Sequence, residues 1–330
     1  MNNSTPSNGA EDSSTEIMTS LSAMAWSFAF GVLAVMAIFG NLSVIFAFAR
    51  DIRLRTRTNF IIVGLSTADL LVSFMAIPLY IAMIMLYTSH RKIHVALNVI
   101  YHAVDVFGGF ASIFHLIFIS LERFYAIAFP VNHRNSSKNI YRRALMGCWV
   151  AAGTLAFIHS IRQSDYNIGG AFFVLFCVCF FVAFIVICAA YFGIWRKTKE
   201  KKLIQKGSGR VFKRHQQEIM ISMSILIVII VFVLTWLPFF CINAIFFFEG
   251  TFKRTSIPFE VVQFTKLLHY SNSAINPIIY SLRIPGFRRT FTGLIRREST
   301  RSLRISLALS RHDSTKNDQG HNLVDATIGS

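Results

Sequence analysis

Apolar residues gather in seven long runs that are separated by short polar stretches. Each run contains about 20 or more mostly uncharged residues, the length that an α-helix needs to cross a bilayer. The runs are Leu21–Phe48, Asn59–Leu86, His94–Ile127, Arg142–Ile161, Gly169–Trp195, Gln217–Phe248 and Pro258–Leu282. The pattern predicts an all-α fold, a seven-transmembrane helix bundle that spans residues 21–284.

The segments outside these runs differ in character. Residues 1–20 are polar, and we expect an extracellular tail there. In residues 285–297 four arginines alternate with apolar residues, which predicts a short amphipathic eighth helix on the inner leaflet, in contact with membrane lipids. Residues 298–330 are polar and rich in Ser and Thr, which predicts a disordered cytoplasmic tail whose serines are candidates for phosphorylation.

A net charge of +17 is, taken alone, consistent with nucleic-acid binding. The positions of the basic residues argue against it, because they cluster in alternate connections between the apolar runs. Four arginines follow the first run, four basic residues follow the third, and nine each lie in residues 196–214 and in the tail from Arg283. Lys and Arg concentrate in short cytoplasmic loops. We therefore expect a multi-pass plasma-membrane protein with an extracellular N-terminus, a cytoplasmic C-terminus and no nucleic-acid partner.

Cysteine and asparagine positions add two expectations about the outer surface. All five cysteines fall within apolar runs, so we expect no extracellular disulfide. Asn2 and Asn3 head overlapping N-x-S/T sequons in the segment predicted to be outside, where glycosylation is plausible.

Charged residues inside the apolar runs are costly and normally mark function. Asp105 and Arg123 lie 18 residues apart in the third run, which is about five helical turns, so they share one helix face roughly 27 Å apart. One stripe thus presents an anion near the outside and a cation near the inside. That layout suits a transducer with a ligand site above and a coupling site below. The alternative for Asp105 is a structural pair with His102 or a loop cation.

A set of short motifs, one in almost every run, resembles the signature positions of the rhodopsin-like (class A) G-protein-coupled receptors. The resemblance covers about Met24–Arg297. The motifs are Gly40–Asn41, L-S-T-A-D at Leu65–Asp69, E-R-F at Glu122–Phe124, Trp149, Tyr191, T-W-L-P at Thr235–Pro238 and N-P-I-I-Y at Asn276–Tyr280. The resemblance implies a receptor for an extracellular ligand that activates a heterotrimeric G protein and that receptor kinases and arrestin engage through the C-terminal Ser and Thr residues.

The resemblance also implies roles for individual residues. Arg123 pairs locally at rest and meets the G protein in the active state, and Pro238 lets the sixth helix bend. The implied coupling residues are Glu122, Arg123, Tyr191, Glu218, Pro238, Pro277 and Tyr280. No cofactor is implied apart from an allosteric Na⁺ at Asp69, Ser112, Asn272, Ser273 and Asn276, with a hydrated polar cluster as the alternative.

The implied ligand site contains an acid and several rings that resemble those of the amine receptors: Asp105, Trp236, Phe239, Phe240 and Tyr270. A carboxylate and aromatic faces suit a small cationic amine. The short second outer loop without cysteine and the fifth run without proline instead look like the melanocortin, adenosine and lipid receptor branch. A peptide, nucleoside or lipid ligand is therefore the alternative.

Two other classes of function compete with the receptor. A seven-span transporter or channel would also contain charges within the membrane, and a decoy receptor would bind its ligand without coupling. An enzyme is disfavoured because the sequence offers no nucleophile–base pair and no His/Cys cluster with metal-ligand spacing.

Epitope tags at the two termini test the predicted topology. We expect antibodies on intact cells to label the N-terminal tag and to reach the C-terminal tag only after permeabilisation, because an odd number of spans separates them. Labelling of both tags on intact cells would contradict the topology.

Overall fold

The computed structural model of the chain describes residues 8–162, 166–204, 209–249, 257–290 and 292–293. The regular structure in these ranges is helical. The elements are α1 (Asn8–Arg50), the 3₁₀ turn η1 (Ile52–Leu54), α2 (Arg57–Leu71), the π-helical turn η2 (Val72–Ala76), α3 (Ile77–Thr88), α4 (Val95–Ala128), α5 (Pro130–Asn135), α6 (Lys138–Arg162), α7 (Tyr166–Ile204), α8 (Gly209–Glu249) and α9 (Phe259–Arg283).

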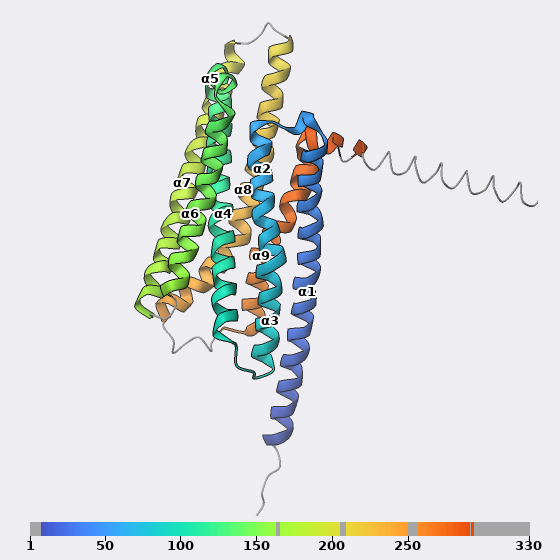
Figure 1. Cartoon of the computed structure of the whole chain (residues 1–330), viewed down its shortest axis with the longest axis vertical. Coiled ribbons are helices and arrows are strands. Elements are labelled where there is room, and N and C mark those ends of the chain that lie inside the picture. Colours follow the sequence, from blue (N-terminus) through green and yellow to red (C-terminus); the bar gives the residue numbers. More distant parts are fainter. Residues whose placement is uncertain (1–7, 163–165, 205–208, 250–256, 291, 294–330) are drawn as a thin grey trace, which may run out of the picture.

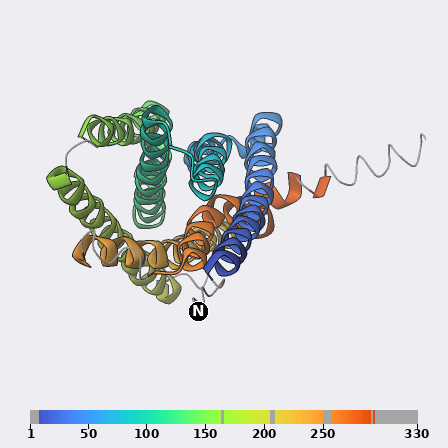
Figure 2. The same cartoon turned by 90° about the horizontal axis from the view of Figure 1, so that it is seen from below.

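The long helices stand side by side as a bundle (Figures 1 and 2). Because α2, η2 and α3 are continuous, the described part of the chain contains seven long helical rods. Six of them, within these ranges, are long and apolar enough to cross a membrane. The seventh, α9, is more polar, but it packs between α1 and α8. The predicted all-α bundle of seven helices is confirmed.

Several helices are longer than the apolar runs that predict them. The first begins at Asn8 rather than Leu21 and has 43 residues, about 64 Å of helix for a hydrocarbon core of about 30 Å. In Figure 1 its N-terminal end projects beyond the other helices. Apolar runs therefore locate the membrane-spanning part of a helix but not its ends.

Prolines interrupt three of the rods. Pro78 is the second residue of α3, two positions after the end of η2, and Pro238 and Pro277 lie inside α8 and α9. A proline has no N–H for the helical ladder, and its ring crowds the carbonyl four residues earlier. The wider turn of η2 relieves this crowding in the second rod.

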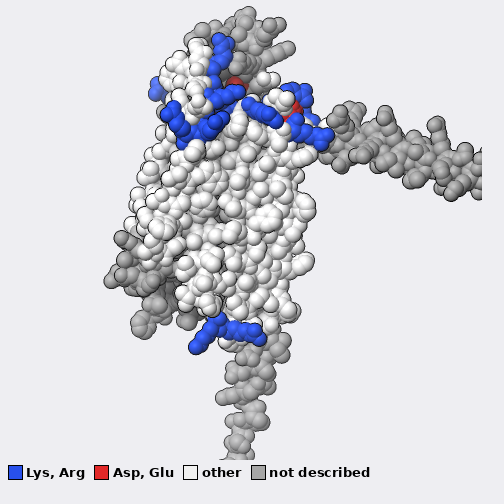
Figure 3. Space-filling view, in the orientation of Figure 1, with Lys and Arg blue, Asp and Glu red and all other residues white. Residues whose placement is uncertain are grey.

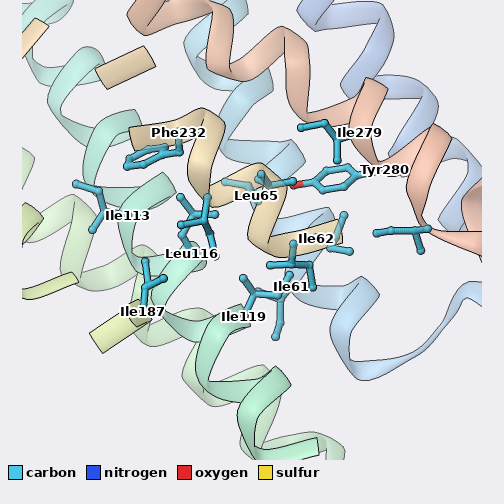
Figure 4. Close-up of a cluster of buried hydrophobic side chains, with 14 of the residues drawn as sticks. Ile61, Ile62, Leu65, Ile113, Leu116, Ile119, Ile187, Phe232, Ile279 and Tyr280 are labelled. Carbon is cyan, nitrogen blue, oxygen red and sulfur yellow. The ribbon is translucent and has the colours of Figure 1, made fainter. Parts of the chain in front are cut away.

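Buried apolar side chains from several helices form the centre of the bundle. Figure 4 shows side chains of α2, α4, α8 and α9 pointing toward one another. The labelled core residues, all of them buried, are Ile61, Ile62, Leu65, Ile113, Leu116, Ile119, Ile187, Phe232, Ile279 and Tyr280. The outer surface is apolar as well, with Phe28, Val150 and Phe181 61–75% exposed. Such a surface is suited to lipid rather than water.

Basic side chains lie mainly at one end of the bundle, called the basic end below. It carries Arg50, Arg53, Arg55, Arg57, Arg134, Lys138, Arg142 and Arg143. Figure 3 shows this group above a broad uncharged band and a smaller basic group at the opposite end, where the α3–α4 connection contains Arg91 and Lys92. This separation matches the charge pattern of a membrane protein.

Residues 285–290 are helical and pack against the η1 segment at the basic end. The Thr290 hydroxyl donates a hydrogen bond to the Asp51 carboxylate at 3.0 Å, and Phe287 is fully buried. Hydrogen bonds from Arg53 lower the pKa of Asp51, so the carboxylate is charged at neutral pH. The predicted eighth helix extends to residue 297, beyond the described residues, and its full length stays a prediction. Asn2, Asn3 and the C-terminal serines also lie outside the described residues.

Close packing of α4 on η2 predicts that Gly108→Ala destabilises the bundle. An added Cβ would clash with Cγ2 of Val72, a stiff β-branched side chain that is buried. We expect a loss of about 1–3 kcal/mol, measured as a lower melting temperature in detergent.

Gly147→Ala is the matched control, because nothing lies within 4 Å of its added Cβ. Adding Val72→Ala to Gly108→Ala should restore part of the loss. Equal melting temperatures for the Gly108 and Gly147 variants would contradict this packing.

Candidate functional site

An ion-pair cluster at the basic end joins α4 to α8. The Arg123 guanidinium donates from Nε to the Glu122 carboxylate at 2.6 Å and from Nη1 to the Glu218 carboxylate at 2.9 Å. Arg123 and Glu122 are 2% and 3% exposed, whereas the Glu218 side chain is 31% exposed. The pair with Glu218 is therefore the water-accessible part of the cluster, and it joins two separate helices.

Two further residues complete this cluster, and the sequence analysis missed both. The Thr58 hydroxyl, in α2, contacts Arg123 and donates to the Glu122 carboxylate at 3.1 Å. The His133 Nε2 atom, in α5, lies 2.8 Å from the same carboxylate. No spacing rule links these residues to the E-R-F motif, because the contacts join different helices.

The two tyrosines predicted to take part in coupling lie in different surroundings. The Tyr191 hydroxyl donates to the backbone carbonyl of Ser222 at 3.0 Å, which joins α7 to α8. Tyr280 is 1% exposed, and its hydroxyl has no hydrogen-bond partner among the described residues. Among the described atoms, no hydrogen bond joins the Tyr191 and Tyr280 hydroxyls.

Asp69 is the centre of a buried polar cluster midway along the bundle. It is fully buried and accepts hydrogen bonds from the Ser273 hydroxyl at 2.7 Å and from the Asn276 amide at 3.0 Å. The Asn41 amide, in α1, donates to the backbone carbonyl of Ser273 at 2.9 Å. The cluster thereby links three helices, α1, α2 and α9.

The cluster also contains oxygen atoms that could ligate a cation. Within the described ranges, the Asn272 and Asn276 Oδ1 atoms have no hydrogen-bond partner, although the residues are 3% and 1% exposed. Ser112, on α4, is 4% exposed. Buried carboxylate and amide oxygens are hard ligands of the kind that alkali and alkaline-earth cations prefer. The residues predicted to bind sodium therefore fit such an ion chemically.

Asp105 forms a buried ion pair with Lys266 toward the opposite end of the bundle. The Lys266 ammonium lies 2.7 Å from Oδ2 of Asp105, and the Tyr270 hydroxyl donates to Oδ1 at 2.9 Å. The side chains of Asp105 and Lys266 are 12% and 6% exposed. Lys266 has no role among the residues predicted from the sequence. Its position one turn before Tyr270 was the signal that could have placed it on the same helix face.

Aromatic rings surround the same ammonium. The Lys266 Nζ atom lies 4.5 Å from the ring centre of Phe239, 4.8 Å from that of Tyr270, and 5.7 Å from those of Tyr80 and Tyr101. These distances allow cation–π attraction, which is strongest where water is excluded. Lys266 is thus neutralised by Asp105 and further stabilised by ring faces.

Trp236 belongs to the hydrophobic core and connects it to the residues around this ion pair. Its ring centre is 4.3 Å from that of His269 and 4.8 Å from that of Phe232, and Phe240 lies 6.0 Å away. His269 in turn stacks on Phe239 at 4.6 Å. The five residues predicted to bind the ligand are therefore joined by a continuous set of contacts, in which Phe240 is reached through Trp236 and Phe239. Lys266 and His269 are members of this set that were not predicted from the sequence.

The family comparison agrees with this geometry. The family described as "7 transmembrane receptor (rhodopsin family)" matches residues 40–171 and 162–280. The chain belongs to this family. It is therefore a multi-pass membrane receptor and not an enzyme, and the receptor class predicted from the motifs is confirmed.

Receptors with different named ligands are similar to this chain. The 5-hydroxytryptamine receptor 4 of Homo sapiens is 29% identical over 340 residues, 88% of this chain and 85% of the relative. The adenosine receptor A3 of Ovis aries is 28% identical over 287 residues, 79% of this chain and 86% of the relative. The somatostatin receptor type 1 of Rattus norvegicus is 25% identical over 294 residues, 83% of this chain and 72% of the relative. The receptor class is common to all three, but the ligand class is not.

Proposed function

We propose that this receptor binds a ligand from outside the cell and activates a heterotrimeric G protein at its basic end, which faces the cytosol. The observation that carries the proposal is the ion pair between Arg123 and Glu218, which joins α4 to α8. Breaking this pair releases Nη1 of the guanidinium and the basic end of α8, while Arg123 keeps its bonds to Glu122. One movement of α8 then links ligand binding at one end of the bundle to G-protein coupling at the other.

The rest of the bundle supports such a movement. Pro238 interrupts the backbone ladder of α8 between Glu218 and the ligand end, so the helix can bend there. Trp236 is two residues away and packs on His269 of α9, so a change in packing at the ligand end reaches the bend directly. Once α8 has moved, Tyr191 loses its bond to Ser222 and can interact with Tyr280.

The ligand enters the opposite end, toward Asp105, Trp236, Phe239, Phe240 and Tyr270. A small cationic amine is the ligand that these residue types favour. Such an amine has to displace the Lys266 ammonium from Asp105 before it can pair with that carboxylate. A peptide, a nucleoside or a lipid is the alternative, consistent with the variety of the named relatives.

Other interactions follow from the same proposal. Na⁺ between Asp69, Ser112, Asn272, Ser273 and Asn276 would neutralise the Asp69 carboxylate and stabilise the resting bundle. Arrestin and a receptor kinase engage the Ser/Thr-rich tail, and lipids contact residues 285–297. The N-terminus is extracellular, where Asn2 and Asn3 carry glycans.

Glu218→Gln should raise basal nucleotide exchange on the G protein about two- to fivefold. A partly exposed ion pair contributes about 0.4–1 kcal/mol to the resting state, which sets this size. Arg123→Ala should reduce exchange without reducing the amount of receptor at the cell surface. The measurement is GTP-analogue binding in membranes that contain receptor and G protein.

The matched control is Glu200→Gln, which removes an acid of α7 that pairs with Lys197 instead. No change in exchange for the Glu218 and Arg123 variants would overturn coupling through this cluster. A receptor that binds ligand without coupling would give that result.

Replacing Na⁺ by choline should raise basal exchange of the unmodified receptor, because the ion favours the resting bundle. Asp69→Asn should remove the difference between the two salts, whereas the control Asp51→Asn, at a partly buried carboxylate of the basic end, should retain it. Equal sodium responses of the Asp69 variant and the unmodified receptor would exclude this site.

A further inference from the structure

The group bound at the predicted amine site is a side chain of the receptor itself. An amine ligand was expected to pair with the Asp105 carboxylate and to lie against the rings of Phe239 and Tyr270. The Lys266 ammonium makes the same three contacts, at 2.7 Å from the carboxylate and 4.5 and 4.8 Å from the two ring centres. Lys266 has therefore taken the position in which an amine ligand would bind.

The attachment of Lys266 to α9 gives it an advantage over any free amine. Lys266 and Tyr270 are four residues apart on α9 and so share a helix face, which points the ammonium and the phenol at the same carboxylate. An intramolecular group acts at an effective concentration that is millimolar or higher. A free monoamine at lower concentration has to compete against it without the benefit of tethering.

Charge balance disfavours binding of a second cation beside the first. Among the described side chains at this position, Asp105 is the one carboxylate and Lys266 balances its charge, while the neighbouring Tyr270 and His269 add no carboxylate. An added ammonium would leave one buried positive charge without a carboxylate, which is costly where water is excluded. The cost disappears only when Lys266 is removed or leaves the site.

We propose that Lys266 determines ligand specificity as the resident cation of the amine site. Its ammonium excludes simple monoamines, and only an amine whose further contacts displace Lys266 from Asp105 can bind. The proposal rests on the ligand site of the proposed function. Removing the lysine side chain opens a space whose missing atoms, three methylenes and an ammonium, are those of n-propylamine. The shortened receptor becomes an amine-binding protein.

The test compares the melting temperature of purified, detergent-solubilised receptor with and without millimolar n-propylamine. Lys266→Ala should melt below the unmodified receptor, because Asp105 loses its partner, and n-propylamine should raise its melting temperature by roughly 3 °C. The unmodified receptor should not respond. The measurement requires no G protein, so n-propylamine can stabilise the variant even if the coupling proposal fails. Equally, the receptor can couple to a G protein even if n-propylamine has no effect.

Three controls separate this site from general effects. 1-Propanol has the same length without the charge and should not stabilise Lys266→Ala. The double variant Asp105→Asn with Lys266→Ala should lose the response, because no carboxylate remains. Lys197→Ala removes a lysine that pairs with Glu200 at 2.7 Å on the surface, and n-propylamine should leave it unchanged.

Where Lys266→Ala accumulates too poorly to purify, the amount at the surface of cells grown with n-propylamine is the second readout, and the amine should increase it. Absence of both responses overturns the proposal. So does an equal response of the unmodified receptor or of the double variant.

Discussion

The requirement that charges within a bilayer be neutralised inside the protein governs the arrangement of this receptor. An unpaired charge in hydrocarbon is expensive. Asp105 pairs with Lys266, and Arg123 pairs with Glu122 and Glu218. Asp69 instead accepts hydrogen bonds from Ser273 and Asn276. Each arrangement joins side chains of different helices, so the interactions that neutralise charge also set how the helices pack.

These three polar centres lie at different levels of one bundle and share helices. Arg123 and Asp105 both lie on α4, Asp69 lies on α2, and α9 contributes Lys266 and Asn276. A displacement of α9 at one level therefore acts on the next level through a rigid helix. Contacts that switch between discrete arrangements, rather than deform gradually, transmit such a displacement in a transducing protein. Because the pair with Glu218 is the most exposed of the three, it is the one most readily exchanged for a partner from solution.

The resident lysine alters how the ligand site should be understood. A carboxylate among aromatic rings suits an amine. The same carboxylate and rings, however, serve a lysine of α9 equally well, because the physical attraction does not depend on whether the ammonium is free or attached to the chain. Residue types at matching positions therefore indicate which chemistry a site stabilises, but not which molecule supplies it.

The sequence alone determined the seven spans, their apolar faces and the placement of Asp105 and Arg123 on one stripe, since helical spacing and bilayer thickness are local properties. It also indicated the residues around Asp69 and Trp236 through family motifs. Tertiary structure alone decided that Lys266, 161 residues from Asp105, neutralises it, and that Thr58 and His133 reach Glu122. Such partners depend on the tilt and rotation of whole helices, and no periodicity within one segment encodes them.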